Sequence, residues 1–273
     1  MQAYSAWTPP TGTLGAIVAE ARERAALLKA NEAELAESAA SVQASPSLAS
    51  ALRRDVVAVI AEVKRRSPSK GWINPGISAA DQAHSYERGG AAAVSILTEP
   101  AHFGGSVSDL VAVRDTVSIP VLKKDFHIDP VQLLEAKALG ASAALLIARA
   151  LSPENLVEMV ATARELSLET IVEIRDDDEL TRALDAGASI IGINNRNLET
   201  LAIDPQTSER LLARIPADVV AIAESGVQSR GDVERFARCG ADAVLVGSVL
   251  SAAQDPVDAV RGLTGVPRTA RGR

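Results

Sequence analysis

The sequence predicts an α/β fold, a closed (βα)8 barrel of the TIM type preceded by an N-terminal helical extension. From residue 56 onward, eight short runs rich in apolar and β-branched residues alternate with segments of helical period. Such near-continuous hydrophobicity is typical of parallel strands that are buried on both faces and joined by helical crossovers. The length of 273 residues is also close to the ~250 residues of such a barrel. The predicted strands are residues 56–63, 92–97, 119–123, 143–147, 169–174, 189–194, 219–224 and 243–247.

A glycine-alanine pair precedes every second strand and supports closure of the sheet. The glycines recur about every 50 residues, so that one period holds two βα units and four periods make eight strands. Glycine can end a helix in the left-handed conformation and let the chain turn tightly into the next strand. An open doubly wound sheet is the structural rival, but no G-x-G-x-x-G sequence follows residue 63, where that fold normally binds a nucleotide. The pairs are Gly90-Ala91, Gly140-Ala141, Gly187-Ala188 and Gly240-Ala241.

The whole chain, residues 1–273, is interpreted as one barrel domain with additional segments at its N-terminus and its C-terminus. Residues 1–50 form the N-terminal helical extension, 51–260 the barrel and 261–273 a flexible tail. The first twelve residues, with two prolines and a glycine, are expected to be a loose arm. Beyond Thr13, apolar residues at helical spacing predict an amphipathic helix with a solvated polar face. These apolar positions are Leu14, Ile17, Val18, Ala21, Ala25 and Leu28.

Charge and composition narrow the class of protein. A net charge of −7 and a pI near 5.1 argue against a surface for nucleic acid or an anionic membrane, because both require an excess of Lys and Arg. No stretch approaches the ~18 uninterrupted apolar residues of a membrane span. The single cysteine, Cys239, cannot form an intramolecular disulfide, and the N-terminus lacks a signal-peptide pattern, so we expect a cytoplasmic protein. Three scattered histidines predict no metal centre.

Polar residues end most of the predicted strands, at the edge where barrels of this kind place their active site. Six of the eight strand ends carry ionic, amide or small polar residues. The alternative is that strands simply become polar where they leave the core, but charge at so many ends of one rim favours an active site. The strand-end residues are Glu62 and Lys64, Lys123 to Asp125, Glu173 and Arg175, Asn194 to Arg196, Glu224 and Ser225, and Gly247 and Ser248.

The spacing of the charged residues indicates which of them share the barrel mouth. Glu62 and Lys64 are two residues apart, so they project on the same face of the strand. Lys123 and Lys124 are adjacent, so one faces the mouth and the other the helical shell. The alternation of side chains along a strand does not by itself decide which lysine faces the mouth. Glu173 supplies a second carboxylate, and carboxylate and ammonium groups crowded in a partly desolvated mouth are expected to favour proton transfer near neutrality. A structural ion-pair network is the alternative, although buried pairs seldom add stability.

Two loops have the composition of a phosphate site. Ser225-Gly226 and Gly247-Ser248 follow the seventh and eighth strands, where barrels often bind phosphate through backbone N–H groups. Residues 67–71 follow the first strand and could close over a ligand. Trp72 and Phe126 flank the mouth, where they can stack on an aromatic substrate or serve as packing anchors. The sequence therefore predicts an enzyme for a small phosphorylated anion.

Six segments resemble the indole-3-glycerol phosphate synthase family. They run through the chain in the order found in that family, and the resemblance extends from the N-terminal helix to about residue 260. The first and fourth segments are highly specific, whereas the last two are shared with other phosphate-binding barrels. The segments are 60–71 (IAEVKRRSPSKG), 122–126 (LKKDF), 172–174 (VEI), 191–198 (IGINNRNL), 223–226 (AESG) and 246–248 (VGS).

The resemblance implies a lyase of tryptophan biosynthesis that cyclises, decarboxylates and dehydrates 1-(2-carboxyphenylamino)-1-deoxyribulose 5-phosphate, with no cofactor and as a monomer. Lys124 is then the general acid that protonates the substrate ketone. Glu173 serves proton transfer during dehydration, and the division of roles among Lys64, Lys124 and Glu173 stays open. The implied catalytic residues are Lys124, Glu62, Glu173, Lys64 and Asn194. The implied substrate-binding residues are Ser67, Phe126, Arg196, Leu198, Glu224, Ser225, Gly226, Gly247 and Ser248, of which Ser67, Gly226, Gly247 and Ser248 bind the phosphate.

Two residues depart from the family pattern, and other functions use the same scaffold. Arg175 stands where some members carry an asparagine, and Asn197 replaces a common aspartate, so the fine positioning of the substrate is open. An isomerase or a Schiff-base aldolase can be built on a phosphate-binding barrel. A sugar-phosphate sensor or scaffold is the non-enzymatic alternative, but it leaves the proton-transfer groups without a purpose.

Overall fold

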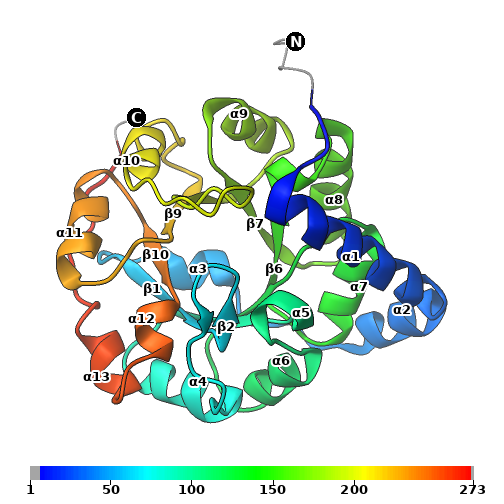
Figure 1. Cartoon of the computed structure of the whole chain (residues 1–273), viewed down its shortest axis with the longest axis horizontal. Coiled ribbons are helices and arrows are strands. Elements are labelled where there is room, and N and C mark those ends of the chain that lie inside the picture. Colours follow the sequence, from blue (N-terminus) through cyan, green and yellow to red (C-terminus); the bar gives the residue numbers. More distant parts are fainter. Residues whose placement is uncertain (1–6, 272–273) are drawn as a thin grey trace.

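The computed structural model describes residues 7–271, and its centre is a closed barrel of eight parallel strands (Figure 1). Neighbouring strands of the barrel follow one another along the chain, and the last strand pairs with the first. The predicted fold class is confirmed, and each predicted strand matches one of these strands to within two residues at either end. The strands are β1 (Ala58–Val63), β4 (Ala93–Leu97), β5 (Val121–Lys124), β6 (Ala143–Ile147), β7 (Glu169–Ile174), β8 (Ile190–Asn194), β9 (Val220–Glu224) and β10 (Ala243–Val246).

Helices surround the barrel, and within residues 7–271 three helices precede its first strand. A short antiparallel hairpin of β2 (Arg66–Ser67) and β3 (Gly71–Trp72) follows β1, in the segment where a loop over the ligand is expected. The helices are α1 (Gly12–Lys29), α2 (Glu32–Ser41), α3 (Leu48–Leu52), α4 (Ala79–Arg88), α5 (Pro100–Phe103), α6 (Val107–Arg114), α7 (Pro130–Ala138), the 3-10 turn η1 (Ala148–Ala150), α8 (Pro153–Glu165), α9 (Asp177–Asp185), α10 (Gln206–Leu212), α11 (Arg230–Arg238), α12 (Ser248–Ser251) and α13 (Pro256–Arg261).

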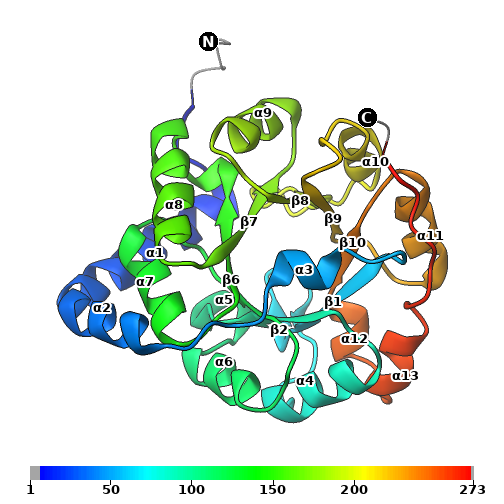
Figure 2. The same ribbon diagram turned by 180° about the vertical axis from the view of Figure 1, so that it is seen from behind.

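Two of the N-terminal helices, α1 and α3, lie at opposite ends of the barrel. Figure 1 shows α1 in front, beside β6 and β7, and the opposite view in Figure 2 shows α3 across the far end. Leu48 and Leu52 of α3 are fully buried and belong to the same apolar cluster as the residues inside the barrel. The apolar positions predicted for α1 are buried as far as Ala25, whereas Leu28 is only half-buried. The extension is therefore part of the core.

Side chains that point alternately to the two faces of each strand form two apolar layers, one inside the barrel and one between the barrel and the helices. Side chains such as Ile60, Leu122 and Ile171 pack inside the barrel, whereas their neighbours pack between the barrel and the helices. Because successive side chains point to opposite faces, the residue two positions beyond an interior residue also faces the interior. This alternation decides which strand-end residues reach the mouth.

The four repeated glycines adopt the conformation that the sequence predicts for them. Their φ angles are positive: +96° at Gly90, +79° at Gly140, +80° at Gly187 and +94° at Gly240. In each pair the alanine N–H donates a hydrogen bond of 3.0 Å to a carbonyl five residues back, in the last turn of the preceding helix. This is the Schellman arrangement, in which a left-handed residue satisfies free carbonyls at a helix end.

The two ends of the described chain make specific contacts. The Trp7 indole N–H donates to the Arg149 carbonyl oxygen at 3.3 Å, and the rest of the expected loose arm, residues 1–6, lies outside the described residues. At the other end, where a flexible tail is expected, the Val57 N–H donates to the Val266 carbonyl and Arg271 pairs with Asp242 at 2.8 Å. Flexibility of residues 261–273 stays a prediction. Among the described residues, no helix combines the length and apolar character needed to cross a bilayer.

Candidate active site

All of the residues predicted for the site line one cavity of about 590 Å³ at the carboxyl ends of the barrel strands. Strand order brings them together, because parallel strands end at the same rim of a barrel. The α1 helix closes one side of this cavity with Thr13, Leu14 and Ile17, a contribution that the sequence pattern did not reveal. The predicted residues on the wall are Glu62, Lys64, Ser67, Lys124, Phe126, Glu173, Asn194, Arg196, Leu198, Glu224, Ser225, Gly226, Gly247 and Ser248.

Five ionic side chains form the centre of the cavity. The Lys124 ammonium lies 3.5 Å from a carboxylate oxygen of Glu173 and 3.6 Å from one of Glu224. The Lys64 ammonium lies 2.5 Å from a Glu62 oxygen. The three carboxyl side chains are almost completely buried, and the two ammonium groups are partly open to the cavity. Groups confined in this way can exchange protons with a bound substrate.

Burial and mutual charge displace the pKa values of this cluster in different directions. Burial lowers the pKa of Lys124, but the nearby Glu173, Glu224 and Glu62 charges outweigh it, and the net pKa is raised. Burial raises the pKa of Glu62, but the Lys64 and Lys124 charges outweigh it, and the net pKa is lowered. Burial also raises the pKa of Glu224, and Glu173 and Glu62 reinforce this against Lys124, so that its pKa is about 8. Glu62 therefore stays ionised, whereas Glu224 holds a proton near neutrality.

Two glycines make room for the buried carboxylates. A methyl group on Gly192 of β8 would overlap the Glu224 carboxylate, and one on Gly247 would overlap that of Glu62. Glycine inside a strand often marks such a close approach. No role is predicted for Gly192 from the sequence, although an isolated glycine within the apolar run of β8 is the available signal. Gly247 has this spatial role in addition to the one predicted for it.

The structure settles which of the adjacent lysines faces the mouth. Leu122 lies inside the barrel, so Lys124, two residues on, also points inward. Lys123 points outward beneath the helices, where its ammonium lies 2.9 Å from Glu135 of α7 and 3.3 Å from His127. Burial and the Lys123 charge lower the pKa of His127 to about 3. Lys123 and His127 thus belong to the packing between barrel and helices.

The loops after β9 and β10 form the polar end of the cavity. Ser225 and Gly226 have left-handed backbones, with φ angles of +65° and +89°. Gly247 and Ser248 begin α12, and N–H groups in the first turn of a helix have no partner within it. Ser67 and Lys70 of the hairpin segment after β1 line the same cavity. Exposed N–H groups beside an ammonium are the environment that a phosphate dianion prefers.

Asn194 and Arg196 follow β8 and have different neighbours. The Asn194 side-chain oxygen accepts the Arg196 N–H at 2.9 Å, and the Arg196 guanidinium donates to the Leu201 carbonyl at 2.8 Å. Asn195 between them is fully buried, and its side chain donates to the Ser225 carbonyl at 2.9 Å. Asn195 therefore joins the loops after β8 and β9, while Asn194 and Arg196 line the cavity.

Part of the cavity wall is apolar. The rings of Phe103 and Phe126 lie 6.1 Å apart between centroids, and Leu145, Ile147 and Leu198 line the same cavity. Phe126 and Leu198 are predicted from the sequence, whereas Phe103 is not, because it lies on α5 rather than at a strand end. Trp72 does not line the cavity: its ring is 59% exposed and packs under the Arg66 guanidinium at 5.5 Å.

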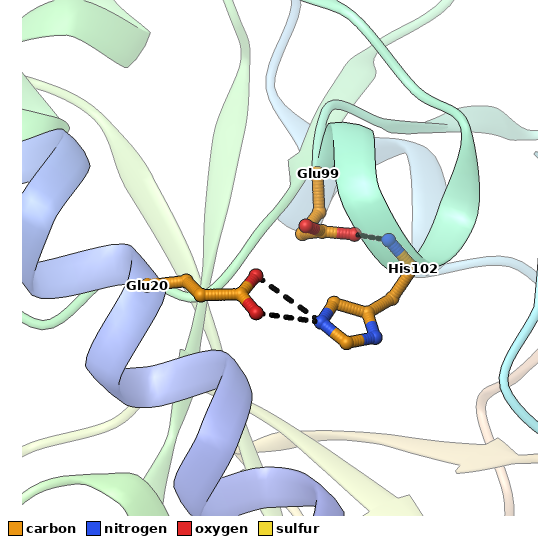
Figure 3. Close-up of side chains that lie close together, drawn as sticks. All are labelled: Glu20, Glu99 and His102. Carbon is orange, nitrogen blue, oxygen red and sulfur yellow. Dashed lines mark hydrogen bonds and ion pairs between the residues drawn. The ribbon is translucent and has the colours of Figure 1, made fainter.

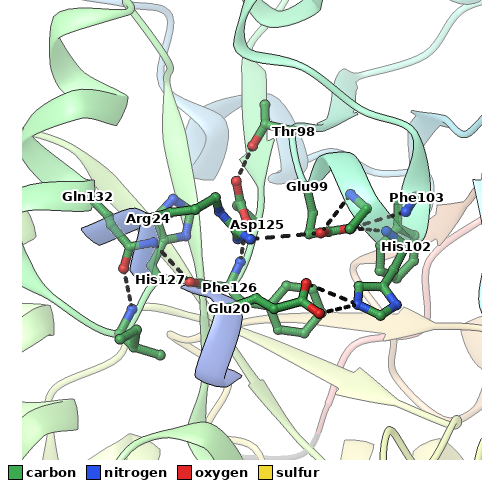
Figure 4. A network of polar contacts seen from close by, with 12 residues as sticks. Glu20, Arg24, Thr98, Glu99, His102, Phe103, Asp125, Phe126, His127 and Gln132 are labelled. Atoms are coloured by element: carbon green, nitrogen blue, oxygen red, sulfur yellow. Dashed lines mark hydrogen bonds and ion pairs between the residues drawn. The ribbon is translucent and has the colours of Figure 1, made fainter. Parts of the chain in front are cut away.

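A polar network ties α1 to the loops that carry the aromatic rings (Figure 4). Asp125 follows Lys124 directly and accepts hydrogen bonds from Thr98 at 2.5 Å and from Arg24 of α1 at 2.9 Å. Burial raises the pKa of Asp125, but Lys123, His127, Thr98 and Arg24 outweigh it and lower the pKa to about 2. The carboxylate is thus an ionised link between α1 and the end of β5.

Glu20, Glu99 and His102 lie close enough together to be compared with a metal site (Figure 3). The Glu99 carboxylate accepts the backbone N–H groups of Ala101, His102 and Phe103, and Arg24 lies 3.8 Å away. His102 contacts Glu20 of α1 at 3.1 Å. Glu99 is thus already occupied as the cap of α5, and these contacts favour a link between α1 and α5 over a ligand set for a cation.

The two residues that depart from the family pattern lie at the edge of the site. Arg175 follows β7, and its N–H donates to the Glu179 carboxylate at 2.7 Å. The Asn197 side chain accepts the N–H groups of Glu199 and Thr200, at 2.8 Å and 3.0 Å. Asn197 therefore shapes the turn after β8, and both residues line a smaller second cavity beside the first.

Comparison with known proteins identifies the relatives of this chain. Residues 14–263 match the family model described as indole-3-glycerol phosphate synthase. Indole-3-glycerol phosphate synthase 2 of Streptomyces coelicolor is 44% identical over 257 residues, 93% of this chain and 100% of that protein. The indole-3-glycerol phosphate synthase of Kineococcus radiotolerans is 52% identical over 207 residues, 76% of each chain.

Solved structures with low sequence identity share the fold. A 3-hexulose-6-phosphate synthase from Salmonella typhimurium superposes with a TM-score of 0.60 at 16% identity, covering 76% of this chain and 96% of that one. A thiamine phosphate pyrophosphorylase from Pyrococcus furiosus gives a TM-score of 0.57 at 13% identity, covering 76% and 93%. At these identities the likeness concerns the barrel alone.

Proposed function

The chain belongs to the indole-3-glycerol phosphate synthase family, and we propose that Lys124, Lys64, Glu62, Glu173 and Asn194 carry out its reaction. The enzyme is a carboxy-lyase of tryptophan biosynthesis. It closes the ring of 1-(2-carboxyphenylamino)-1-deoxyribulose 5-phosphate and releases CO2 and water to form indole-3-glycerol phosphate. The assignment of individual roles follows from the charges and neighbours of each side chain.

The cavity has three regions that match the three parts of this substrate. The phosphate lies against Ser67, Gly226, Gly247 and Ser248, where backbone N–H groups favour a dianion. The aromatic ring lies against the apolar wall formed by Phe103, Phe126, Leu145, Ile147 and Leu198. The sugar chain between them passes the ionic centre, where Glu224 and Ser225 hold its hydroxyl groups and Asn194 and Arg196 orient the hydroxyl and carboxylate groups.

Lys124 is the general acid of ring closure. Its ammonium donates a proton to the ketone oxygen as the aromatic carbon attacks, and the ring loses its aromaticity. Loss of CO2 then returns the electron pair to the ring, while Lys64 and Arg196 stabilise the departing carboxylate. Glu173 moves protons during the dehydration that follows, and Glu62 holds Lys64 in place. Because the cationic ring formed by the attack accepts these electrons, no electron-sink cofactor is required.

The position of the Lys124 ammonium between Glu173 and Glu224 carries this proposal. We expect the purified protein to convert the substrate to a product with indole fluorescence. Replacement Lys124→Met should lower kcat by at least about 10²-fold, the contribution of a general acid, while the substrate still binds. Lys29→Met on the exposed face of α1 serves as the matched control and should leave kcat unchanged.

Two results would contradict the proposal. Absence of indole product from the unmodified protein would favour an isomerase on the same barrel. Trapping of a lysine-substrate adduct by borohydride would indicate an imine and hence a Schiff-base aldolase.

We propose further that the enzyme acts as a monomer in the cytoplasm. All of the residues assigned to the site come from one chain, and the single cysteine offers no intramolecular disulfide. Light scattering at the concentration used for the activity assay measures the mass, and a dimer mass would refute the first part. Recovery of the protein in a secreted fraction would refute the second.

A further inference from the structure

A second cavity of about 110 Å³ adjoins the active site beside β7 and β8. Both cavities are lined by Glu173, Asn194 and Arg196, so Glu173 lies on the wall that the two cavities share. The rest of the wall of the smaller cavity comes from α1, the ends of β6 and β7, η1, the loops after β7 and β8, and α9. A polar cavity of this size has room for several water molecules.

Glu179 of α9 lines the second cavity but not the first. Its side chain is 4% exposed, one oxygen accepts the Arg175 N–H at 2.7 Å, and its own N–H donates to Asp176. Arg175 lines the same cavity, and its Nε is buried without a hydrogen-bond partner among residues 7–271. Buried donors of this kind are usually satisfied by ordered water.

The charged groups around Glu179 come from several elements. Asp176, Arg175 and Glu173 lie on β7 or the loop after it, and Arg182 lies one turn further along α9. Across the cavity stand Arg149 of η1 and, from the loop after β8, Arg196 and Glu199. Burial and the charges of Asp176 and Glu173 raise the pKa of Glu179, whereas Arg175 and Arg182 lower it. The net result is a pKa of about 7.

The reaction of this family consumes a proton. Its substrate enters with a carboxylate, and its products are a neutral indole ring, CO2 and water, so charge balance requires one H⁺ from solvent for each turnover. Ring closure takes that proton from Lys124, according to the proposed function. When substrate fills the cavity, which α1 closes on one side, Lys124 needs a separate route along which it regains its proton.

We propose that the second cavity is this proton-entry route, in which Glu179 takes a proton from solvent and passes it through water to Glu173 and on to Lys124. The Glu179 carboxylic acid gives its proton to a cavity water, which gives one of its own to the Glu173 carboxylate. Glu173 then protonates the neutral Lys124 amine, 3.5 Å away, and returns to its anionic form. Glu179 regains its proton from solvent, so the sequence is balanced. The inference rests on the roles proposed above for Glu173 and Lys124.

The replacement Glu179→Gln separates proton transfer from structure. The amide oxygen can still accept the Arg175 N–H, so the first turn of α9 is preserved, but an amide carries no proton to donate. We expect kcat to fall about tenfold near pH 7, because general acid-base steps contribute more than this and bulk water replaces part of the route. KM and the melting temperature should stay unchanged, and imidazole buffer should partly restore kcat in the variant only.

The pH profile gives a readout that a structural role does not change. In the unmodified enzyme kcat should fall as the pH rises through about 7, because Glu179 then loses its proton, and this limb should be absent from the variant. Glu154→Gln, which removes a charge from the exposed first turn of α8, is the control and should behave like the unmodified enzyme.

The outcomes are distinguishable. If Glu179→Gln leaves kcat and its pH profile unchanged, or lowers the melting temperature and raises KM together with the loss of kcat, Glu179 acts only as a structural cap and the route is refuted. If the unmodified protein forms no indole product, it is the proposed function that fails.

Discussion

Three carboxyl groups and two ammonium groups share the mouth of the barrel, so not all of the carboxyl groups need be ionised. With all five charged, the cluster has a net charge of −1, and one additional proton makes it neutral. The group that takes this proton is Glu224, whose pKa is raised, while the pKa of Glu62 is lowered. Glu62 and Glu224 therefore have different protonation states, because different charges surround the two carboxyl groups.

This difference predicts unequal effects of two amide replacements. Glu224→Gln resembles the protonated form that Glu224 has at about pH 7, so we expect kcat to fall less than about tenfold. Glu173→Gln removes the group to which we assign proton transfer during dehydration, and kcat should fall by about 10²-fold or more. Steady-state kinetics of both variants between about pH 6 and 9 measures this. Equal losses at pH 7 would show that Glu224 acts as a carboxylate.

At the scale of elements, α1 is coupled to the strand that carries Lys124. Arg24 of α1 binds Asp125, which follows Lys124 directly and also accepts the Thr98 hydroxyl. The same helix places Leu14 and Ile17 on the cavity wall. Docking of the N-terminal extension and shaping of the active site thus depend on the same contacts.

The ionised state of Asp125 predicts a contribution to stability that depends on pH. Its pKa is lowered in the folded protein to about 2, from 3.8, so this contribution is present above about pH 4 and is lost as the pH falls through about 2. By this shift, Asp125→Asn should lower the free energy of unfolding by about 2 kcal/mol at neutral pH.

Denaturant titrations at about pH 7 and pH 2.5 test this prediction, and the difference between variant and unmodified protein should shrink at the lower pH. Asp115→Asn removes an exposed carboxylate and is the control, with an expected change below about 0.5 kcal/mol. A difference that stays constant with pH would mean that the ionisation of Asp125 contributes nothing.

For the whole molecule, the two ends of the barrel domain meet at the amino ends of the strands. The Arg268 N–H donates to the Asp55 carbonyl, just before β1. The buried Asp242 before β10 pairs with Arg268 at 2.6 Å and with Arg271 at 2.8 Å. Its carboxylate also accepts the N–H of Ala221, the second residue of β9, at 2.8 Å. These contacts lie at the opposite end from the active site, where barrels place stability rather than chemistry.

Loss of one of these contacts should affect stability and leave catalysis intact. Arg271→Ala removes an almost fully buried partner of Asp242, and we expect the free energy of unfolding to fall by about 2 kcal/mol, as for a hydrogen bond to a charged group. Arg261→Ala, in an exposed pair with Asp258, should cost less than about 0.5 kcal/mol. Thermal unfolding and kcat are the measurements. An unchanged melting temperature for Arg271→Ala would support the flexible tail expected from the sequence.

The sequence by itself determined the fold class, the eight strands and the rim at which the functional residues gather. These follow from local patterns: buried parallel strands require continuous apolar runs, helix ends require residues such as Gly90 and Gly140 that tolerate a positive φ, and parallel strands end at one rim. Every predicted site residue lies on one cavity for this reason.

Only the tertiary structure decided which of Lys123 and Lys124 faces the mouth, because alternation fixes the relative orientation of two neighbours and closure of the barrel fixes which face is inside. It alone placed α1 and Phe103 on the cavity wall, and it alone revealed the need for Gly192 beneath Glu224. The protonation states of Glu62, Glu179 and Glu224 also depend on burial and on charges from distant parts of the chain. Such effects act through space, and a pattern of residues along the chain does not contain them.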